Sequence, residues 1–412
     1  MRCAAAASLL AMALAGQPRL WAQAPAVSTA PAKAPALRLL SEEEIPDFAD
    51  SFPSKRGLVK AAHKTLAYLE KSSGPKFIRI GERDYGAAIL ADSIKALLEI
   101  LKAEPAPEEL REKIKESFDV FQSAGSDGAG KVVFSAYYQP TLPASLKKSP
   151  AHPYPIYRKP PDMVTMEPGL FDKKCNGEPL IGRVDKDKRL VPYFTREQID
   201  VRKVLAGRDL EIAWLKNKFD RLDLHIQGSG ILRFPSGKEM LAKYAATNAL
   251  PYQSVGLLLL KANVFGKEEL SHDKIRQYLR AHPEGEDWIL AQNPRYTFFE
   301  LVPLPTDGEP FGTMEQSLVP ARSIAVDPAV IPLGALAFFT TVSPQADREG
   351  RLLGQSPNSR FALCMDTGGA IKGPGRVDIY AGHGPQAQAT ARSQWHEGKL
   401  FILVKKIPPR ER

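Results

Sequence analysis

Asp366 and Asp378 form the pattern in this chain that most resembles a catalytic site. They lie twelve residues apart beside two short apolar segments, and the loop between them contains four glycines. Such a loop allows two strands to pack closely, so we expect the two carboxylates to lie near one another. On an extended strand, Arg376, Asp378 and Tyr380 share one face, and the apolar residues that flank Asp378 would desolvate it. Desolvation raises the pKa of a carboxyl group toward that of a general acid, although a structural hairpin with Asp366 in its turn fits the spacing equally well.

Other polar and aromatic residues give weaker signals. Asp327 precedes a proline, and because Asp-Pro commonly begins a turn, a structural role is the simpler interpretation. The segment Gln227–Gly230 (QGSG) places polar groups on a loop that we expect to be mobile, but it is not the nucleophile elbow of a serine hydrolase. Five aromatic side chains have the character needed to stack on sugar faces, although most aromatic residues in proteins are core: Tyr137, Tyr138, Tyr154, Tyr157 and Trp214.

The sequence predicts neither a metal nor an organic cofactor. Cys3, Cys175 and Cys364 are too few and too far apart for a disulfide framework or a zinc site, and the seven histidines show no H-E-x-x-H pattern. The glycine-rich segment Gly125–Gly130 lies between a predicted helix and a predicted strand, which is the reverse of the order in a phosphate-binding loop.

Composition indicates a soluble globular chain. The 412 residues carry a net charge of +9 and are 43% hydrophobic and 25% charged, which is unlike a disordered protein. This length suits two domains, and 35 prolines with 30 glycines favour a turn-rich β architecture. The positive charge is spread along the chain, so nucleic acid is not an expected partner. Beyond the N-terminus, no apolar stretch is long enough for a transmembrane helix.

The N-terminus has the features of a secretory signal peptide, expected over residues 1–24. Arg2 precedes an apolar core from Ala4 to Ala15, and small residues that suit cleavage follow. Residues 25–40 then form a Pro/Ala-rich spacer. A lipid-accepting cysteine would follow the apolar core, whereas Cys3 precedes it, so we expect no lipid attachment and a mature protein that is soluble outside the cytoplasm.

Hydrophobic periodicity predicts several helices followed by a strand-rich C-terminal part. Helices are predicted at Ala87–Lys102, Pro107–Phe121, Lys238–Thr247, Ser254–Asn263, Lys267–Ala281 and Glu286–Gln292, with another short one after a capping box of Thr195 and Gln198. Strands are predicted at Val132–Tyr138, Phe298–Val302, Leu336–Thr341, Phe361–Met365, Val377–Tyr380 and Leu400–Lys405. The segment Val342–Arg360 is expected to be a disordered loop.

Several segments, in order from about Phe134 to Val404, resemble the membrane-bound lytic murein transglycosylase A family. They are Phe134–Pro140 (FSAYYQP), Tyr154–Tyr157 with Pro160–Asp162, Gln227–Gly230, Tyr244–Asn248 with Pro251–Gly256, Asn293–Phe298, Ala325–Asp327, Asp366–Gly373 and Val377–Tyr380. The last group is similar to the family's C-terminal domain, which is named for three aspartates.

This resemblance implies a mainly β protein with peripheral helices, in which a double-psi β-barrel catalytic domain carries a second, inserted β-barrel-like domain. We expect residues 41–149 and 298–406 to form the catalytic domain with its N-terminal helices, and residues 150–297 to form the insert. The glycan strands of peptidoglycan would bind in the groove between the two domains. The resemblance also implies non-hydrolytic cleavage of the β-1,4 bond between MurNAc and GlcNAc, which leaves a 1,6-anhydro-MurNAc end. The expected location is the periplasm, either free or peripheral at the outer membrane.

In this family a single aspartate acts first as acid and then as base, and the residue that matches it is Asp378. Asp366 and Asp327 match the other two named aspartates, and we expect the first to support developing charge and the second to be mainly structural. Substrate contacts are expected from Tyr137, Gln139, Gln227, Gly228, Ser229, Gly368, Gly369 and Lys372. The chain departs from the family's pattern at Ala136 and Ala246, where glycine is expected, at Leu250, where histidine is usual, and at Gln388, where another glycine is usual.

Two other functions remain compatible with the sequence. A water-using glycan hydrolase on the same fold needs a second carboxylate as base or nucleophile, and Asp366 is the residue that would supply it. A non-enzymatic cell-wall-binding module would keep the groove without a desolvated acid.

Overall fold

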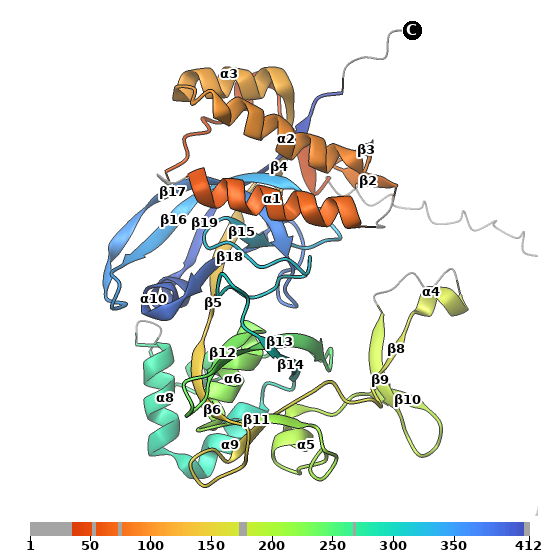
Figure 1. Ribbon diagram of the computed structural model, residues 1–412, viewed down its shortest axis with the longest axis vertical. Coiled ribbons are helices and arrows are strands. Elements are labelled where there is room, and N and C mark those ends of the chain that lie inside the picture. Colours follow the sequence, from red (N-terminus) through yellow and green to blue (C-terminus); the bar gives the residue numbers. More distant parts are fainter. Residues whose placement is uncertain (1–34, 52–54, 73–75, 173–178, 267–268, 408–412) are drawn as a thin grey trace, which may run out of the picture. The chain divides into compact units, whose positions relative to one another are not determined.

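A computed structural model describes residues 35–51, 55–72, 76–172, 179–266 and 269–407 (Figure 1). The predicted signal peptide and most of the predicted spacer lie outside these residues. The described strands form two larger sheets and two small ones. Within the described ranges, no helix combines the length and the apolar character needed to cross a membrane.

Helices near the N-terminus pack against the first large sheet. Pro107 stands in the first turn of α3, where its fixed φ suits a helix start. Leu58, Ile94 and Ile114, one from each of three helices, share a buried cluster with Phe338 of the sheet. The elements of this part are β1 (Leu37–Leu39), η1 (Glu42–Glu44), α1 (Lys55–Lys71), β2 (Phe77–Ile80), β3 (Arg83–Gly86), α2 (Ala88–Lys102), α3 (Pro107–Ser117) and β4 (Phe118–Ser123).

Six strands of the first sheet close into a barrel. They follow one another in the order β5, β18, β15, β17, β16 and β19, and β19 pairs back onto β5. Their bounds are β5 (Val132–Gln139), β15 (Ser323–Ala325), β16 (Leu336–Ala346), β17 (Leu352–Asp366), β18 (Arg376–His383) and β19 (Trp395–Lys405). One buried cluster draws residues from all six strands, including Phe134, Phe339 and Val377, as the interior of a closed barrel requires. Asp378 follows Val377 and therefore points to the outer face.

The second sheet has the strand order β14, β13, β12, β6, β11 and β7. Its strands are β6 (Thr141–Ser145), β7 (Tyr154–Tyr157), β11 (Glu211–Leu215), β12 (Gly230–Arg233), β13 (Glu239–Thr247) and β14 (Thr297–Pro303). The sheet has a core of its own, which includes Ile156, Leu232 and Phe299. Its helices are α5 (Arg196–Asp200), α6 (Lys218–Gln227), α7 (Val255–Lys261), α8 (His272–Ala281) and α9 (Pro283–Ala291). A small sheet of β8 (Val164–Met166), β9 (Leu180–Val184) and β10 (Leu190–Pro192), with α4 (Pro168–Phe171), branches from this region.

The chain passes between the two large sheets at different points from those predicted. β5 continues through Pro140 directly into β6, which pairs with β12 and β11 of the second sheet. β14 also belongs to the second sheet, where it pairs with β13. The boundaries expected after residues 149 and 297 thus assign β6 and β14 to the wrong sheet, because one extended segment serves both sheets without a break in its sequence pattern.

Three predicted elements are corrected by the structure. Residues 239–247 form β13 rather than a helix, since hydrogen bonds to β12 and β14 on either side override a local helical pattern. The helix expected over Pro107–Phe121 ends at Ser117, and the residues that follow pair with β1 and β19 as β4. The expected disordered loop over Val342–Arg360 is the extension of the long β16–β17 hairpin. The short helix with its Thr195–Gln198 capping box is confirmed.

Candidate active site

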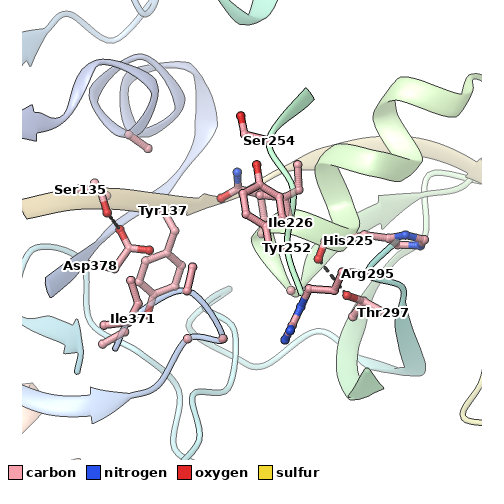
Figure 2. Close-up of a pocket in the computed structure, with 18 of the residues that line it drawn as sticks. Ser135, Tyr137, His225, Ile226, Tyr252, Ser254, Arg295, Thr297, Ile371 and Asp378 are labelled. Atoms are coloured by element: carbon pink, nitrogen blue, oxygen red, sulfur yellow. Dashed lines mark hydrogen bonds between the residues drawn. The ribbon is translucent and has the colours of Figure 1, made fainter. Parts of the chain in front are cut away.

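Asp378 lies on the outer face of β18, between two neighbouring strands. It pairs with Ser135 of β5 on one side and with Ala325 of β15 on the other. The Ser135 hydroxyl donates a hydrogen bond of 2.5 Å to Asp378 Oδ1, and Figure 2 shows this contact. Val377 and Ile379 are buried on the opposite face of the strand. Alternation along the strand therefore presents the carboxyl group outward, as the sequence predicted.

Desolvation by the surrounding protein raises the pKa of Asp378 to about 6. The hydrogen bond from Ser135 and the charge of Arg376 lower this pKa, whereas the charge of Asp366 raises it. Among the described residues, Ser135 is the one hydrogen-bond donor to this carboxyl group, and its bond to Oδ1 leaves Oδ2 for the proton. Asp378 thus has the protonation behaviour required of a general acid near neutral pH.

Asp366 ends β17 and lies in a different environment. Oδ2 accepts a hydrogen bond of 2.8 Å from the Tyr137 hydroxyl, and Oδ1 accepts two bonds of 2.9 Å from the Thr313 amide and hydroxyl. Desolvation raises the pKa of Asp366, and these donors oppose that rise. Because donors stabilise the ionised form of a carboxyl group, the three hydrogen bonds to Asp366 favour its ionised form more than the bond from Ser135 favours that of Asp378.

The two strands that carry these aspartates are not neighbours, contrary to the close packing expected from the glycine loop. β15 runs between them, and its Ala325 pairs with Asp366 on one side and Asp378 on the other. Two strand spacings separate the backbones, about 10 Å. The small Ala325 side chain, which lines the cavity between them, leaves both carboxylates accessible from the same side.

Asp327 has a position that differs from the other two aspartates. Its side chain is 7% exposed, Oδ2 accepts a hydrogen bond of 2.6 Å from the Gly373 amide, and Oδ1 accepts one of 3.1 Å from the Ala329 amide. It does not line the cavity beside Asp378. Asp327 therefore holds the loop between β17 and β18 in place.

A cavity of about 760 Å³ opens beside Asp378, a volume in the usual range for ligand sites. Figure 2 shows Ser135, Tyr137, Ile371 and Asp378 on one side of it and Tyr252 and Arg295 on the other. Of the predicted site residues, those that line it are Tyr137, Gln227, Gly228, Asp366, Gly368, Gly369 and Asp378. Gln139, Ser229 and Lys372 are not among its lining residues, and Gln139 is only 1% exposed where β5 passes into β6.

The QGSG segment is shaped by the end of α6. Gly228 caps the helix with φ of +82°, a conformation that favours glycine, and its amide donates to the Leu224 carbonyl. A side chain at Gly230 would place its Cβ 2.5 Å from Leu224 Cδ1 and 3.1 Å from the Pro140 carbonyl oxygen. The two glycines are therefore explained by the turn and by close packing against the strand passage.

Gln227 is fixed by a polar cluster that joins β5, α6 and α10 (Gly384–Ser393). Its Oε1 accepts a hydrogen bond from the Tyr138 amide, and its Nε2 donates to Asp223 Oδ1. The Tyr138 hydroxyl donates to Asp223 Oδ2 at 2.8 Å and accepts from Arg392. The amide of Gln388, one of the positions that depart from the family's pattern, lies 3.0 Å from the same hydroxyl. Gln227 is thus positioned rather than mobile.

Several residues that line the cavity are not among the site residues predicted from the sequence. Tyr244 and Tyr252 line the cavity and are 47% and 41% exposed, and Trp395 is 67% exposed. Arg295 reaches Gly369, where even a methyl group would lie 2.4 Å from its Nη2. Tyr244 and Arg295 fall in segments that resemble the family, whereas nothing in the sequence around Trp395 marks it.

Comparisons with known proteins identify the family of this chain. The MltA specific insert domain matches residues 133–300, and the 3D domain matches residues 322–404. Membrane-bound lytic murein transglycosylase A of Escherichia coli K12 is 30% identical over 288 residues, which are 69% of this chain and 69% of that protein. The chain belongs to the membrane-bound lytic murein transglycosylase A family. The Vibrio cholerae member is 27% identical over 68% of each protein.

Solved structures of membrane-bound lytic murein transglycosylases share the fold. The protein from Agrobacterium tumefaciens superposes with a TM-score of 0.70 at 28% identity, covering 90% of this chain and 98% of that one. The Escherichia coli MltA structure with bound chitohexaose has a TM-score of 0.64 at 24% identity, covering 90% and 95% of the respective chains. The mainly β architecture with its closed six-stranded barrel is therefore the fold of this transglycosylase family.

Proposed function

We propose that Asp378 cleaves the β-1,4 bond between MurNAc and GlcNAc in peptidoglycan glycan strands without water and leaves a 1,6-anhydro-MurNAc end. Membership of the membrane-bound lytic murein transglycosylase A family makes the protein a lytic transglycosylase, an enzyme rather than a glycan-binding module. The observation that carries the assignment is the Asp378 carboxyl, which lines the cavity with a pKa near 6.

The hydrogen bonds of Asp366 favour this reaction over hydrolysis. A hydrolase needs a second carboxylate that is free to accept a proton from water or to attack the sugar. Both oxygens of Asp366 already accept hydrogen bonds from Tyr137 and Thr313. Asp366 is therefore suited to fixed electrostatic support, and a hydroxyl group of the substrate itself has to serve as nucleophile.

The mechanism follows from this division of roles. Protonated Asp378 donates its proton to the glycosidic oxygen as the bond to C1 of MurNAc breaks. The charge of Asp366 stabilises the positive charge that develops at C1. Ionised Asp378 then accepts the proton of the C6 hydroxyl of the same MurNAc, which attacks C1 and closes the anhydro ring. Because that nucleophile is held within the sugar, proximity replaces the positioned water of a hydrolase.

Mass analysis of a peptidoglycan digest tests the proposal. The purified protein should release fragments whose MurNAc ends are lighter by one water than hydrolysed ends, and the variant Asp378→Asn should release almost none. Products that carry the mass of a reducing end would instead assign the protein as a hydrolase. Binding without any released fragment would contradict the proposed reaction.

Two finer features of the architecture are also proposed. The barrel contains parallel pairs between β5 and β18 and between β15 and β17, which supports the double-psi type. We propose that the barrel with its N-terminal helices is the catalytic domain and that the second sheet, entered after Pro140 and left after Pro303, is the inserted domain. Limited proteolysis that removes the second sheet and leaves β5 associated with β15–β19 in a folded barrel would support this division.

Export is proposed from the leader-like residues 1–24, with the mature protein in the periplasm, free or peripheral at the outer membrane. Cell fractionation tests this location. Release by osmotic shock or by a high-salt wash is the expected result, whereas retention in the washed membrane pellet would contradict it.

A further inference from the structure

Arg376 lies two residues before Asp378 on the same outer face of β18, and both residues line the cavity. The Arg376 guanidinium carbon lies 4.2 Å from the centre of the Trp395 ring. The two residues meet because β5 separates β18 from β19 and pairs with both of them, through Val133 with Arg376 and through Ser135 with Trp395. The fold thus builds a flat cationic and aromatic surface beside the acid.

The hydrogen-bonding of the cavity arginines singles out Arg376. Arg196 donates to the Asn293 and Arg295 carbonyls, Arg295 donates to the Leu250 carbonyl, and Arg392 donates to the Tyr138 hydroxyl. Those three guanidinium groups are engaged by the protein itself. No side-chain hydrogen bond from Arg376 to another described residue is present, and its Nη1 is buried without a partner.

An arginine in this state is poised to bind an anion. A guanidinium group remains charged in proteins and presents donors in a flat fork that matches a carboxylate. Unpaired donors on a partly buried guanidinium group are energetically unfavourable, so a ligand that pairs with them gains binding free energy. Asp378, the carboxyl group whose charge acts on Arg376, is held by Ser135 instead. A substrate that carries an anion can therefore supply the missing hydrogen-bond acceptor.

We propose that Arg376, stacked on Trp395, binds a carboxylate that the glycan carries next to the cleaved bond. This inference rests on the proposed function. Two residues along a strand span about 7 Å, roughly the reach from the glycosidic oxygen across a sugar ring to its substituent. In peptidoglycan that substituent is the lactyl group of MurNAc, whose carboxylate is free in stem-free strands, while peptide stems bear carboxylates of their own. Strands made only of GlcNAc have none.

The experiment compares kcat/KM within matched pairs of substrates. One pair is stem-free glycan with its lactyl carboxylates free or converted to methylamides, and the other is stem-bearing glycan with its stem carboxylates free or amidated. The wild-type protein should prefer the free carboxylate about tenfold to a hundredfold in one of the pairs, as expected for hydrogen bonds to a charged group. Because both substrates of a pair are measured with the same variant, the ratio of their kcat/KM values cancels any effect of the substitution on Asp378.

Three variants complete the design. Arg376→Gln should reduce the preference to near unity, and Arg376→Lys should restore part of it by keeping the charge without the fork. Arg295→Gln removes a cavity arginine that already donates to the protein, so it should leave the ratio intact even if both rates fall. Loss of preference in the stem-free pair identifies the lactyl carboxylate, and loss in the stem-bearing pair identifies the stem.

The proposal is overturned if wild type and Arg376→Gln show the same ratio in both pairs, or if wild type has no preference in either pair. These outcomes differ from failure of the proposed function. In that case the wild-type protein would release no anhydro ends from any of the four substrates.

Discussion

Replacing Asp378 by asparagine should lower activity and raise stability at high pH. The same desolvation that raises the pKa of this carboxyl group also destabilises the folded protein once the group ionises. The neutral amide cannot donate a proton to the glycosidic oxygen or later accept one from the C6 hydroxyl. Loss of a general acid typically lowers a rate by about 10²–10⁴, and here one group serves in both steps. We therefore expect kcat of Asp378→Asn to fall by at least about 10³, with glycan binding retained.

The pH dependence of the wild-type enzyme follows from the same group. The pKa of Asp378 is about 6, and the reaction begins from the protonated form. The value of kcat/KM should therefore fall about tenfold for each pH unit above that pKa. A profile that stays flat to pH 8, or that rises through pH 6, would mean that Asp378 is not the proton donor.

The stability effect has the opposite direction. A carboxyl group whose pKa is raised in the folded state contributes stability that is fully present below its ordinary pKa of 3.8 and is lost as the pH rises through about 6. At 1.36 kcal/mol for each pKa unit, this loss is at most about 3 kcal/mol at pH 8, and less where water in the cavity screens the charge. Asparagine has no such cost, and its side-chain oxygen still accepts the hydrogen bond from Ser135.

Urea unfolding at pH 5 and pH 8 measures this difference. Asp378→Asn should be more stable than wild type at pH 8 by up to about 3 kcal/mol, and the gain should shrink toward pH 5. Asp366→Asn is the matched control, because it removes the other carboxylate of the cavity, which already accepts hydrogen bonds from Tyr137 and Thr313. This variant should lose only part of the catalytic rate. If Asp366→Asn is inactive and Asp378→Asn is not, the two roles are reversed.

Three further predictions follow from neighbouring contacts and from the residue types. Ser135→Ala removes a hydrogen bond that lowers the pKa of Asp378, so the alkaline limb of the rate profile should move to higher pH, and movement to lower pH would contradict this assignment. Asp327→Asn weakens the bond to the Gly373 amide and should cost about 1–3 kcal/mol of stability by urea unfolding, with most of the activity of the folded protein kept. Activity should persist in excess chelator, because the sequence offers no set of metal ligands at suitable spacing, and loss that zinc or calcium reverses would overturn that expectation.

The roles of individual residues along β18 could be predicted from local sequence. Side chains alternate along any extended strand, so Arg376 and Asp378 were expected on one face and Val377 on the other, and this is observed. The strand at Val132–Tyr138 and the capping box at Thr195 could be predicted for the same reason. Each depends only on residues a few positions apart, and both are observed in the structure.

Strand order and strand pairing depend on distant parts of the chain, and there the local pattern was insufficient. The glycine loop after Asp366 indicated two adjacent strands, but β15, from about forty residues earlier, lies between them and contributes Ala325. Residues 239–247 have a helical pattern, yet they form β13 because strands on both sides supply hydrogen-bond partners. A short segment contains no information about which partners will be available.

The cavity itself belongs to the tertiary structure alone. Trp395 lies against Arg376 only because β5 pairs with both of their strands, and no pattern near position 395 indicates this contact. Asp366 accepts hydrogen bonds from Thr313 and Asp378 accepts one from Ser135, and both donors are far from these aspartates in sequence. Sequence could identify the residue types needed for acid catalysis, whereas the pKa of Asp378 depends on which groups the fold brings around it.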